Sequence, residues 1–146
     1  MEERLLSKVR VFAPNLINIC VDERKQGEIS GRLYHCYTPH AILFSNVVEL
    51  LRHAEALYDS IAFPQASTKT RSFGKSDENR RAERPEKVQS QEAFIEERGA
   101  IGTFLLFVQA RQNATWQGEV YWMEQDKKQY FTNVLDFVKI IDHALI

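Results

Sequence analysis

The chain aligns with itself, without a gap, when it is shifted by 87 positions. Residues 15–59 then match residues 102–146, and the strongest similarity pairs residues 44–52 with residues 131–139, where nine consecutive positions keep their side-chain class. Four further pairs are identical: Gly31 and Gly118, Tyr34 and Tyr121, Val21 and Val108, and Arg24 and Arg111. A duplicated segment of this length must fold as one supersecondary unit in each copy. The repeat therefore constrains the architecture of the chain, although it says little about its chemistry.

Length and composition are those of one globular domain that spans residues 1–146. The chain is 44% hydrophobic and 27% charged, and its formal net charge is -1, so neither a general polyanion binder nor an acidic tail is indicated. Residues 64–92 separate the copies and are polar, which predicts a loosely packed connector. The sequence has neither an apolar run of about 18 residues, as a membrane span requires, nor a secretory signal. We therefore expect a cytoplasmic protein that does not enter a membrane.

Each copy opens with two segments typical of β-strands. Residues 16–22 alternate apolar and polar side chains, and the equivalent residues 103–109 are rich in aromatic and β-branched types. A second alternating segment contains Gly31 in the first copy and Gly118 in the second, and a short third strand is expected after it. A glycine inside a strand indicates a bulge, a bend or a close approach by a neighbouring group. We expect the close approach, by a large side chain from the following helix.

A helix follows in each copy. Asn46 stands three residues before Glu49, and Asn133 stands three residues before Asp136, which is the spacing of a capping box. Apolar residues then recur at helical spacing in both copies, as in a helix with one buried face. The predicted unit is therefore β-β-(β)-α.

Neither copy can bury both its apolar helix stripe and its apolar sheet face alone. We expect an α+β fold in which the two copies pair about a pseudo-two-fold axis. This arrangement gives one antiparallel sheet of four to six strands with two helices on one face. Two small sheets, docked helix to helix, are the alternative.

The sequence contains no motif of catalysis or metal binding. The four histidines have no cysteine or carboxylate partner at a spacing typical of zinc sites, and no glycine-rich phosphate loop or nucleophile elbow is present. Cys20 and Cys36 align with Phe107 and Met123, so both thiols are expected to pack as small apolar side chains. We therefore expect no cofactor, and a binding protein in preference to an enzyme. An enzyme whose residues assemble from distant positions is the alternative.

The sheet face opposite the helices is the expected binding surface. By the period of two along a strand, it carries too many apolar side chains for a purely solvated face. The candidate partner-binding residues are Tyr34, Leu105, Phe107, Tyr121 and Met123, with the arginines Arg24 and Arg111 beside them. Aromatic residues and methionine favour a protein partner or a second copy of the chain. Two other interpretations stay open. The N-terminal segment or the connector covers these residues, or the aromatic and basic groups bind single-stranded nucleic acid.

The strand Trp116-Gln117-Gly118 and the Phe-x-Asn-Val-x-acid start of each helix resemble a family of small uncharacterised bacterial proteins. The resemblance covers both copies and the stretch from Phe63 to Phe73. It implies a bacterial protein with an internal duplication, and it brings no activity, substrate or site residue.

Overall fold

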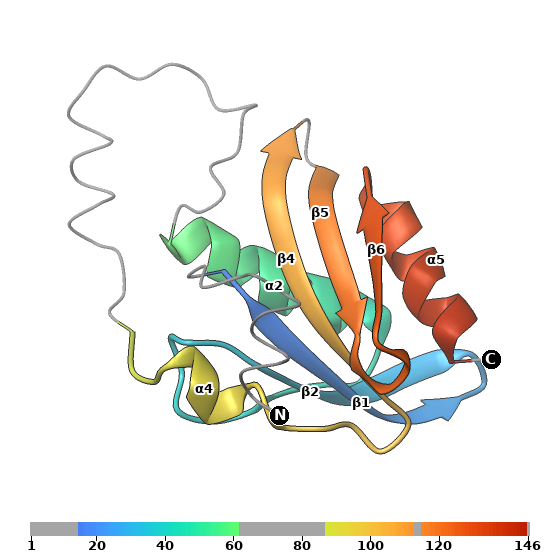
Figure 1. Cartoon of the computed structure of the whole chain (residues 1–146), viewed down its shortest axis with the longest axis horizontal. Helices are drawn as coiled ribbons and strands as arrows, with labels where there is room; N and C mark the ends of the chain where they lie inside the picture. Colours follow the sequence, from blue (N-terminus) through green and yellow to red (C-terminus); the bar gives the residue numbers. More distant parts are fainter. Residues whose placement is uncertain (1–14, 62–86, 113–114, 146) are drawn as a thin grey trace.

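The structure is a computed structural model that describes residues 15–61, 87–112 and 115–145. The N-terminal segment and most of the predicted connector at 64–92 lie outside these residues. Within them the chain has an α+β fold, with one six-stranded antiparallel sheet and three α-helices (Figure 1). The predicted α+β class and the single antiparallel sheet are confirmed, at the upper end of the predicted strand number. The alternative of two separate sheets is wrong.

The strands lie in the order β3-β2-β1-β4-β5-β6, so β3 and β6 form the two edges of the sheet. The strands are β1 (Ile17–Lys25), β2 (Glu28–Tyr34), β3 (Ile42–Phe44), β4 (Gly102–Gln112), β5 (Thr115–Trp122) and β6 (Lys127–Phe131). The helices are α2 (Val47–Ile61), α4 (Gln91–Phe94) and α5 (Val134–Ala144), with a 3-10 turn, η1, at Met123–Gln125. Strands β1 and β4 pair at the centre, where the two halves of the sheet meet.

The two long helices pack on one face of the sheet and form a single core with it. In Figure 1, α2 runs behind β4 and β5, and α5 lies beside β6. The helices contribute the buried residues Leu50, Ala54, Leu57, Tyr58, Ile61, Phe137 and Ile141. These side chains meet alternate residues of the central strands, among them Ile19, Phe104 and Leu106. Because burying one such aliphatic or aromatic side chain contributes about 1.5–3 kcal/mol, this face of the sheet is specified by the hydrophobic effect.

Both long helices are capped by the asparagines that the sequence identifies. Oδ1 of Asn46 accepts a hydrogen bond from the Glu49 amide at 2.8 Å. Oδ1 of Asn133 accepts one from the Asp136 amide, also at 2.8 Å. Glu49 also reaches back over the start of α2, where its Oε1 accepts from the backbone N–H of Ser45 at 2.8 Å, one residue before the amide that a capping box bonds. The shorter Asp136 accepts only side-chain hydrogen bonds from the two residues before the helix, which follows from its missing methylene group.

The two strand glycines face a backbone rather than a helix side chain, so that part of the expectation is wrong. Each glycine lies opposite a β-bulge in the neighbouring strand. A Cβ added at Gly31 would lie 2.0 Å from the carbonyl oxygen of Cys20, and one added at Gly118 would lie 2.1 Å from that of Phe107. No side chain fits at either position unless the strands move apart. The glycines therefore allow two bulged strand pairs to form at equivalent places in the sheet.

Candidate functional site

The second face of the sheet carries the predicted apolar cluster, but most of that cluster is buried. It consists of Leu16, Ile95, Leu105, Tyr121 and Met123, with the half-buried Phe107 packed against it. Leu105, Tyr121 and Met123 are at most 8% exposed. This corrects the expectation that these three residues lie on an accessible surface. A partner that approaches this face in the present structure does not reach them.

Residues 87–101, which contain α4, lie against this second face at β1 and β2. The Asn18 side chain donates a hydrogen bond to the carbonyl of Phe94 at 2.8 Å. The guanidinium of Arg32 donates to another carbonyl of this segment at 2.7 Å and to the hydroxyl of Tyr34 at 2.5 Å. Tyr34 is therefore half-buried and already engaged within the chain. The interpretation in which another part of the chain covers the face agrees with these contacts, which come from the residues at and after the end of the connector.

Arg24 and Arg111 lie on the helix side of the sheet, not beside the aromatic residues of the second face. Arg111 is buried and pairs through Nη1 with Glu55 at 2.9 Å and Asp59 at 2.8 Å. Arg24 pairs through Nη2 with Asp142 at 2.7 Å. The bulges in β1 and β4 explain the difference, since the extra residue in each strand reverses which side chains face the helices. This corrects the expectation that both arginines flank the binding face.

Large apolar side chains are exposed at both edges of the sheet. Leu43 in β3 is 73% exposed and Tyr130 in β6 is 70% exposed. Val48 and Leu135, in the first turns of α2 and α5, are also exposed. The members of each pair, Leu43 with Tyr130 and Val48 with Leu135, are separated by 87 positions in the sequence. The accessible apolar surface therefore lies at the edges of the sheet, next to the start of a helix.

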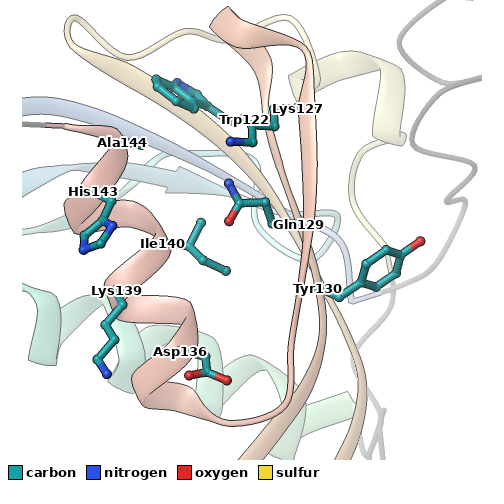
Figure 2. Close-up of a pocket in the computed structure, with 9 residues that line it drawn as sticks. All are labelled: Trp122, Lys127, Gln129, Tyr130, Asp136, Lys139, Ile140, His143 and Ala144. Carbon is teal, nitrogen blue, oxygen red and sulfur yellow. The ribbon is translucent and has the colours of Figure 1, made fainter.

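One edge carries a pocket of about 440 Å³ between β6 and α5. Its lining consists of Trp122, Lys127, Gln129, Tyr130, Asp136, Lys139, Ile140, His143 and Ala144 (Figure 2). Figure 2 shows the side chain of Gln129 inside the pocket, whereas the ring of Tyr130 points away from it. The pocket is thus a groove with the edge strand as one wall and the last helix as the other.

The opposite edge of the sheet is bridged at the equivalent place. Nε2 of His53 in α2 lies 3.1 Å from the carbonyl oxygen of Leu43, so the helix bonds to the outer side of β3. Ile140 of α5 aligns with His53 at the 87-residue offset and carries no polar side-chain group. The carbonyl of Tyr130, which aligns with that of Leu43, receives no such bond from position 140. The edge at β3 therefore carries a bond between helix and strand at a place where the edge at β6 has none, and the pocket lies at β6.

The backbone of β6 also offers hydrogen-bonding groups on its outer side. Along an antiparallel strand, residues alternate between those that bond to one neighbour and those that face the other way. The carbonyl of Phe107 in β4 points toward β5, where it lies against Gly118. Followed through the registers of β4, β5 and β6, this alternation directs the amide and carbonyl groups of Lys128 and Tyr130 away from β5. These are the groups with which a further strand pairs.

Three hydrogen-bond donors surround the end of the groove near the start of β6. Trp122 and Lys127 lie opposite each other across β5 and β6, so both side chains point to the helix side, and Gln129 follows on the same side. Among the described residues, the buried Nε1 of Trp122 has no hydrogen-bond partner. A buried donor without an acceptor costs about 1–3 kcal/mol. Trp122 thus lines the groove and carries a buried donor that lacks an acceptor in this structure.

The described part of the chain contains no candidate metal centre, and its two cysteines are buried. Residues 15–61, 87–112 and 115–145 contain no group of three or more His, Cys, Asp and Glu side chains placed to hold a metal ion. Cys20 and Cys36 are free and buried, which confirms their predicted packing role. Burial raises the pKa of the Cys20 thiol to about 12, so at neutral pH it is a protonated, weak nucleophile. Over the same ranges, every helix is too short or too polar to cross a bilayer.

The residues of the β6–α5 groove were not among the site residues predicted from the sequence. Period-two alternation assigns a side chain to a face of the sheet, but it does not say which strand forms an edge. One signal was present in the alignment of the chain with itself at the 87-residue offset, where Ile140 aligns with His53. Its meaning depends on a contact between helix and edge strand that only the structure supplies.

Comparison with known proteins gives no further guide to this site. No protein-family model matches the chain, and searches against curated proteins and against solved structures give no match.

Proposed function

We propose that the protein is a non-enzymatic binding protein that captures an extended segment of a partner protein as an additional strand along β6. The observation that carries this proposal is the difference between the two edges of the sheet. One edge is bridged by His53, whereas the other borders a pocket of about 440 Å³. Addition of a strand to an exposed sheet edge, with side-chain pockets for specificity, is a common mode of peptide recognition.

The two kinds of contact have different roles in this proposal. The outward amide and carbonyl groups of Lys128 and Tyr130 bond to the backbone of the incoming segment. Because each such bond has a net value of only about 0.5–1.5 kcal/mol, the backbone provides the binding mode and little specificity. Side chains of an added strand alternate between the two faces. On the helix side they enter the groove, and on the other side they meet the exposed ring of Tyr130, which is 70% exposed.

We further infer that the two edges descend from one duplicated unit whose copies are related by a pseudo-two-fold axis between β1 and β4. The bulges that follow Val21 and Val108 support this inference, because these residues are 87 positions apart. The ion pairs between strands and helices also support this inference. Arg24 pairs with Asp142 in the other copy, and a shift by 87 positions converts this pair into the one between Arg111 and Glu55. On this view one copy has kept a closed edge and the other has an open edge.

A proline substitution on the outer side of β6 tests the proposal. The full chain would be used to select binders from a random octapeptide library displayed on phage. The selected peptides would then be titrated against the ¹⁵N-labelled protein by NMR. Lys128→Pro removes an outward amide but no bond to β5, and edge strands tolerate proline on that side. We expect this variant to lose peptide binding, while the matched control Lys128→Ala retains it.

Three outcomes would contradict the proposal. The first is that the library yields no binder to the wild-type chain. The second is that selected peptides bind Lys128→Pro and wild type equally. The third is that peptides shift resonances elsewhere, for example around Phe107 on the second face of the sheet. A second copy of the chain is the other molecule that could pair with β6. Analytical sedimentation of wild type and Lys128→Pro at several concentrations tests this possibility. A dimer that the proline dissociates would show that β6 pairs with a second copy.

A further inference from the structure

We propose that the groove selects a segment carrying an acidic side chain, and that its carboxylate binds between Lys127, Gln129 and Nε1 of Trp122. This inference rests on the proposed strand addition at β6, and it names the partner chemistry of that site. It concerns an acidic side chain within an extended segment of another protein, not the free carboxylate at the end of a chain.

The charge of the groove supports an anionic group. Its lining contains the cationic side chains of Lys127 and Lys139, and Asp136 is the one carboxylate among the lining residues. That carboxylate already accepts hydrogen bonds at the start of α5, among them one from the hydroxyl of Thr132 at 3.2 Å. Within the lining, the two lysines therefore face one carboxylate, which is already engaged at the start of α5. A hydrogen bond to a charged acceptor is roughly twice as strong as one between neutral groups.

The geometry of the strands brings the donors together. Lys127 is the cross-strand partner of Trp122, and Gln129 is two residues further along β6 on the same face. Figure 2 shows the ammonium group of Lys127 beside the indole and the amide of Gln129 inside the pocket. The Trp122 ring is held in place because it stacks on Phe104 with 6.2 Å between the ring centroids. Two donors on the edge strand and one on its neighbour thus converge on one corner.

The indole nitrogen of Trp122 is buried in the free protein, so the proposed site must open when a ligand binds. Nε1 of Trp122 is buried and lacks an acceptor among the described residues. Lys127, which lies opposite it, is an exposed side chain with a flexible stem. The proposed binding requires the indole N–H to become accessible, and we place that change at Lys127, the flexible side chain opposite Trp122. The buried donor then gains the partner that it lacks in the free protein.

The direction of the incoming side chain favours an internal residue over a chain terminus. In an added strand, the residue beside Gln129 projects to the same face as Gln129 and therefore into the groove. A residue in the middle of a segment can occupy this place while the strand continues to pair beside Lys128 and Tyr130. A terminal carboxylate lies in the backbone line of the strand, on its hydrogen-bonding edge, and is not directed at the corner formed by Trp122.

Three synthetic hexapeptides provide the test, with the full-length protein and NMR titration as the readout. The first is N-acetyl-Thr-Val-Thr-Glu-Thr-Val-amide, and the second carries Gln in place of Glu. The third carries Gln and a free carboxyl terminus. We expect the Glu peptide to bind about tenfold more tightly than either Gln peptide, which corresponds to about 1.4 kcal/mol. Lys127→Met is expected to abolish this preference, whereas the control Lys87→Met, at an exposed residue away from the groove, is expected to retain it.

The results separate this inference from the proposal on which it rests. If both blocked peptides bind with equal affinity and Lys128→Pro abolishes both, strand addition stands and the acidic preference is wrong. A gain confined to the peptide with a free terminus would also overturn the inference, in favour of recognition of a chain end. If no peptide binds at β6, both the acidic preference and the proposed strand addition are wrong. Dispersed amide spectra of the variants provide the check that each is folded, and Lys127→Gln serves as a second variant if Lys127→Met is not.

Discussion

Acidification below about pH 6.5 is expected to destabilise the fold through His35. This residue follows β2, is 6% exposed, and its Nδ1 accepts a hydrogen bond from the backbone N–H of Tyr37 at 3.0 Å. Burial lowers the pKa of His35 from 6.5 to about 4. A protonated imidazole has no acceptor nitrogen, so the proton also breaks the bond to Tyr37. Both the burial of the His35 ring and its hydrogen bond to Tyr37 therefore favour the neutral imidazole.

The size and the direction of the effect follow from proton linkage. Since the folded-state pKa is the lower one, the unfolded chain binds the proton first as the pH falls. The free energy of unfolding is therefore unchanged by His35 above about pH 6.5, and it falls progressively between about pH 6.5 and about pH 4. The difference between 6.5 and about 4 corresponds to about 3 kcal/mol in the free energy of unfolding. At pH 5, the same relation gives a loss of about 2 kcal/mol.

Urea denaturation at about pH 7.5 and pH 5 measures this loss, with the fluorescence of the two tryptophans as the signal. Other groups titrate in acid, so the wild type is compared with His35→Gln. Glutamine does not titrate, and its carbonyl oxygen is an acceptor for the Tyr37 amide. We expect the wild type to lose about 2 kcal/mol more than the variant over this range.

Equal losses in the two proteins would refute the reasoning. They would mean that the folded state admits a proton at His35 without cost, and that burial does not hold the ring neutral. An NMR titration in which His35 titrates near pH 6.5 in the folded protein would lead to the same conclusion.

Two further predictions concern stability and use matched variants. Gly31→Ala is expected to lower the free energy of unfolding by about 2–4 kcal/mol, because its Cβ would lie 2.0 Å from the carbonyl oxygen of Cys20. Gly27→Ala is expected to lower it by about 1–2 kcal/mol, because Gly27 has a φ of 82° but no atom within 4 Å of the added Cβ. Chemical denaturation checks this order, and equal costs would contradict the close approach of the strands. Arg111→Met is expected to cost about 2 kcal/mol, because it removes a buried guanidinium with two carboxylate partners, and Arg24→Met, at a partly exposed pair, less than about 1 kcal/mol. A larger loss for Arg24→Met in thermal unfolding would show that burial does not distinguish the two ion pairs.

Much of the fold follows from local patterns in the sequence. The alternation in residues 16–22 predicts β1, and the asparagine-to-acid spacing predicts the starts of α2 and α5, which the hydrogen bonds of Asn46 and Asn133 confirm. These features are local, because strand periodicity and helix capping depend on residues within one or two turns of each other. The apolar stripes that they create then require one sheet face and two helices to share a core.

The candidate site depends on contacts between residues far apart in the chain. One extra residue at each bulge moved Arg24 and Arg111 to the helix side, and an alternation of two cannot anticipate a bulge. Residues 87–101 cover part of the apolar second face, although nothing local in them indicates where they pack. The groove along β6 lies at an edge that the strand order sets, and Ile140, unlike His53, makes no bond to its edge strand. The sequence by itself determined the main strands and the two long helices and, as far as the bulges, their buried faces, since those follow from periodicity. The tertiary structure alone decided which surface is accessible, because accessibility depends on strand order and on what packs against each face.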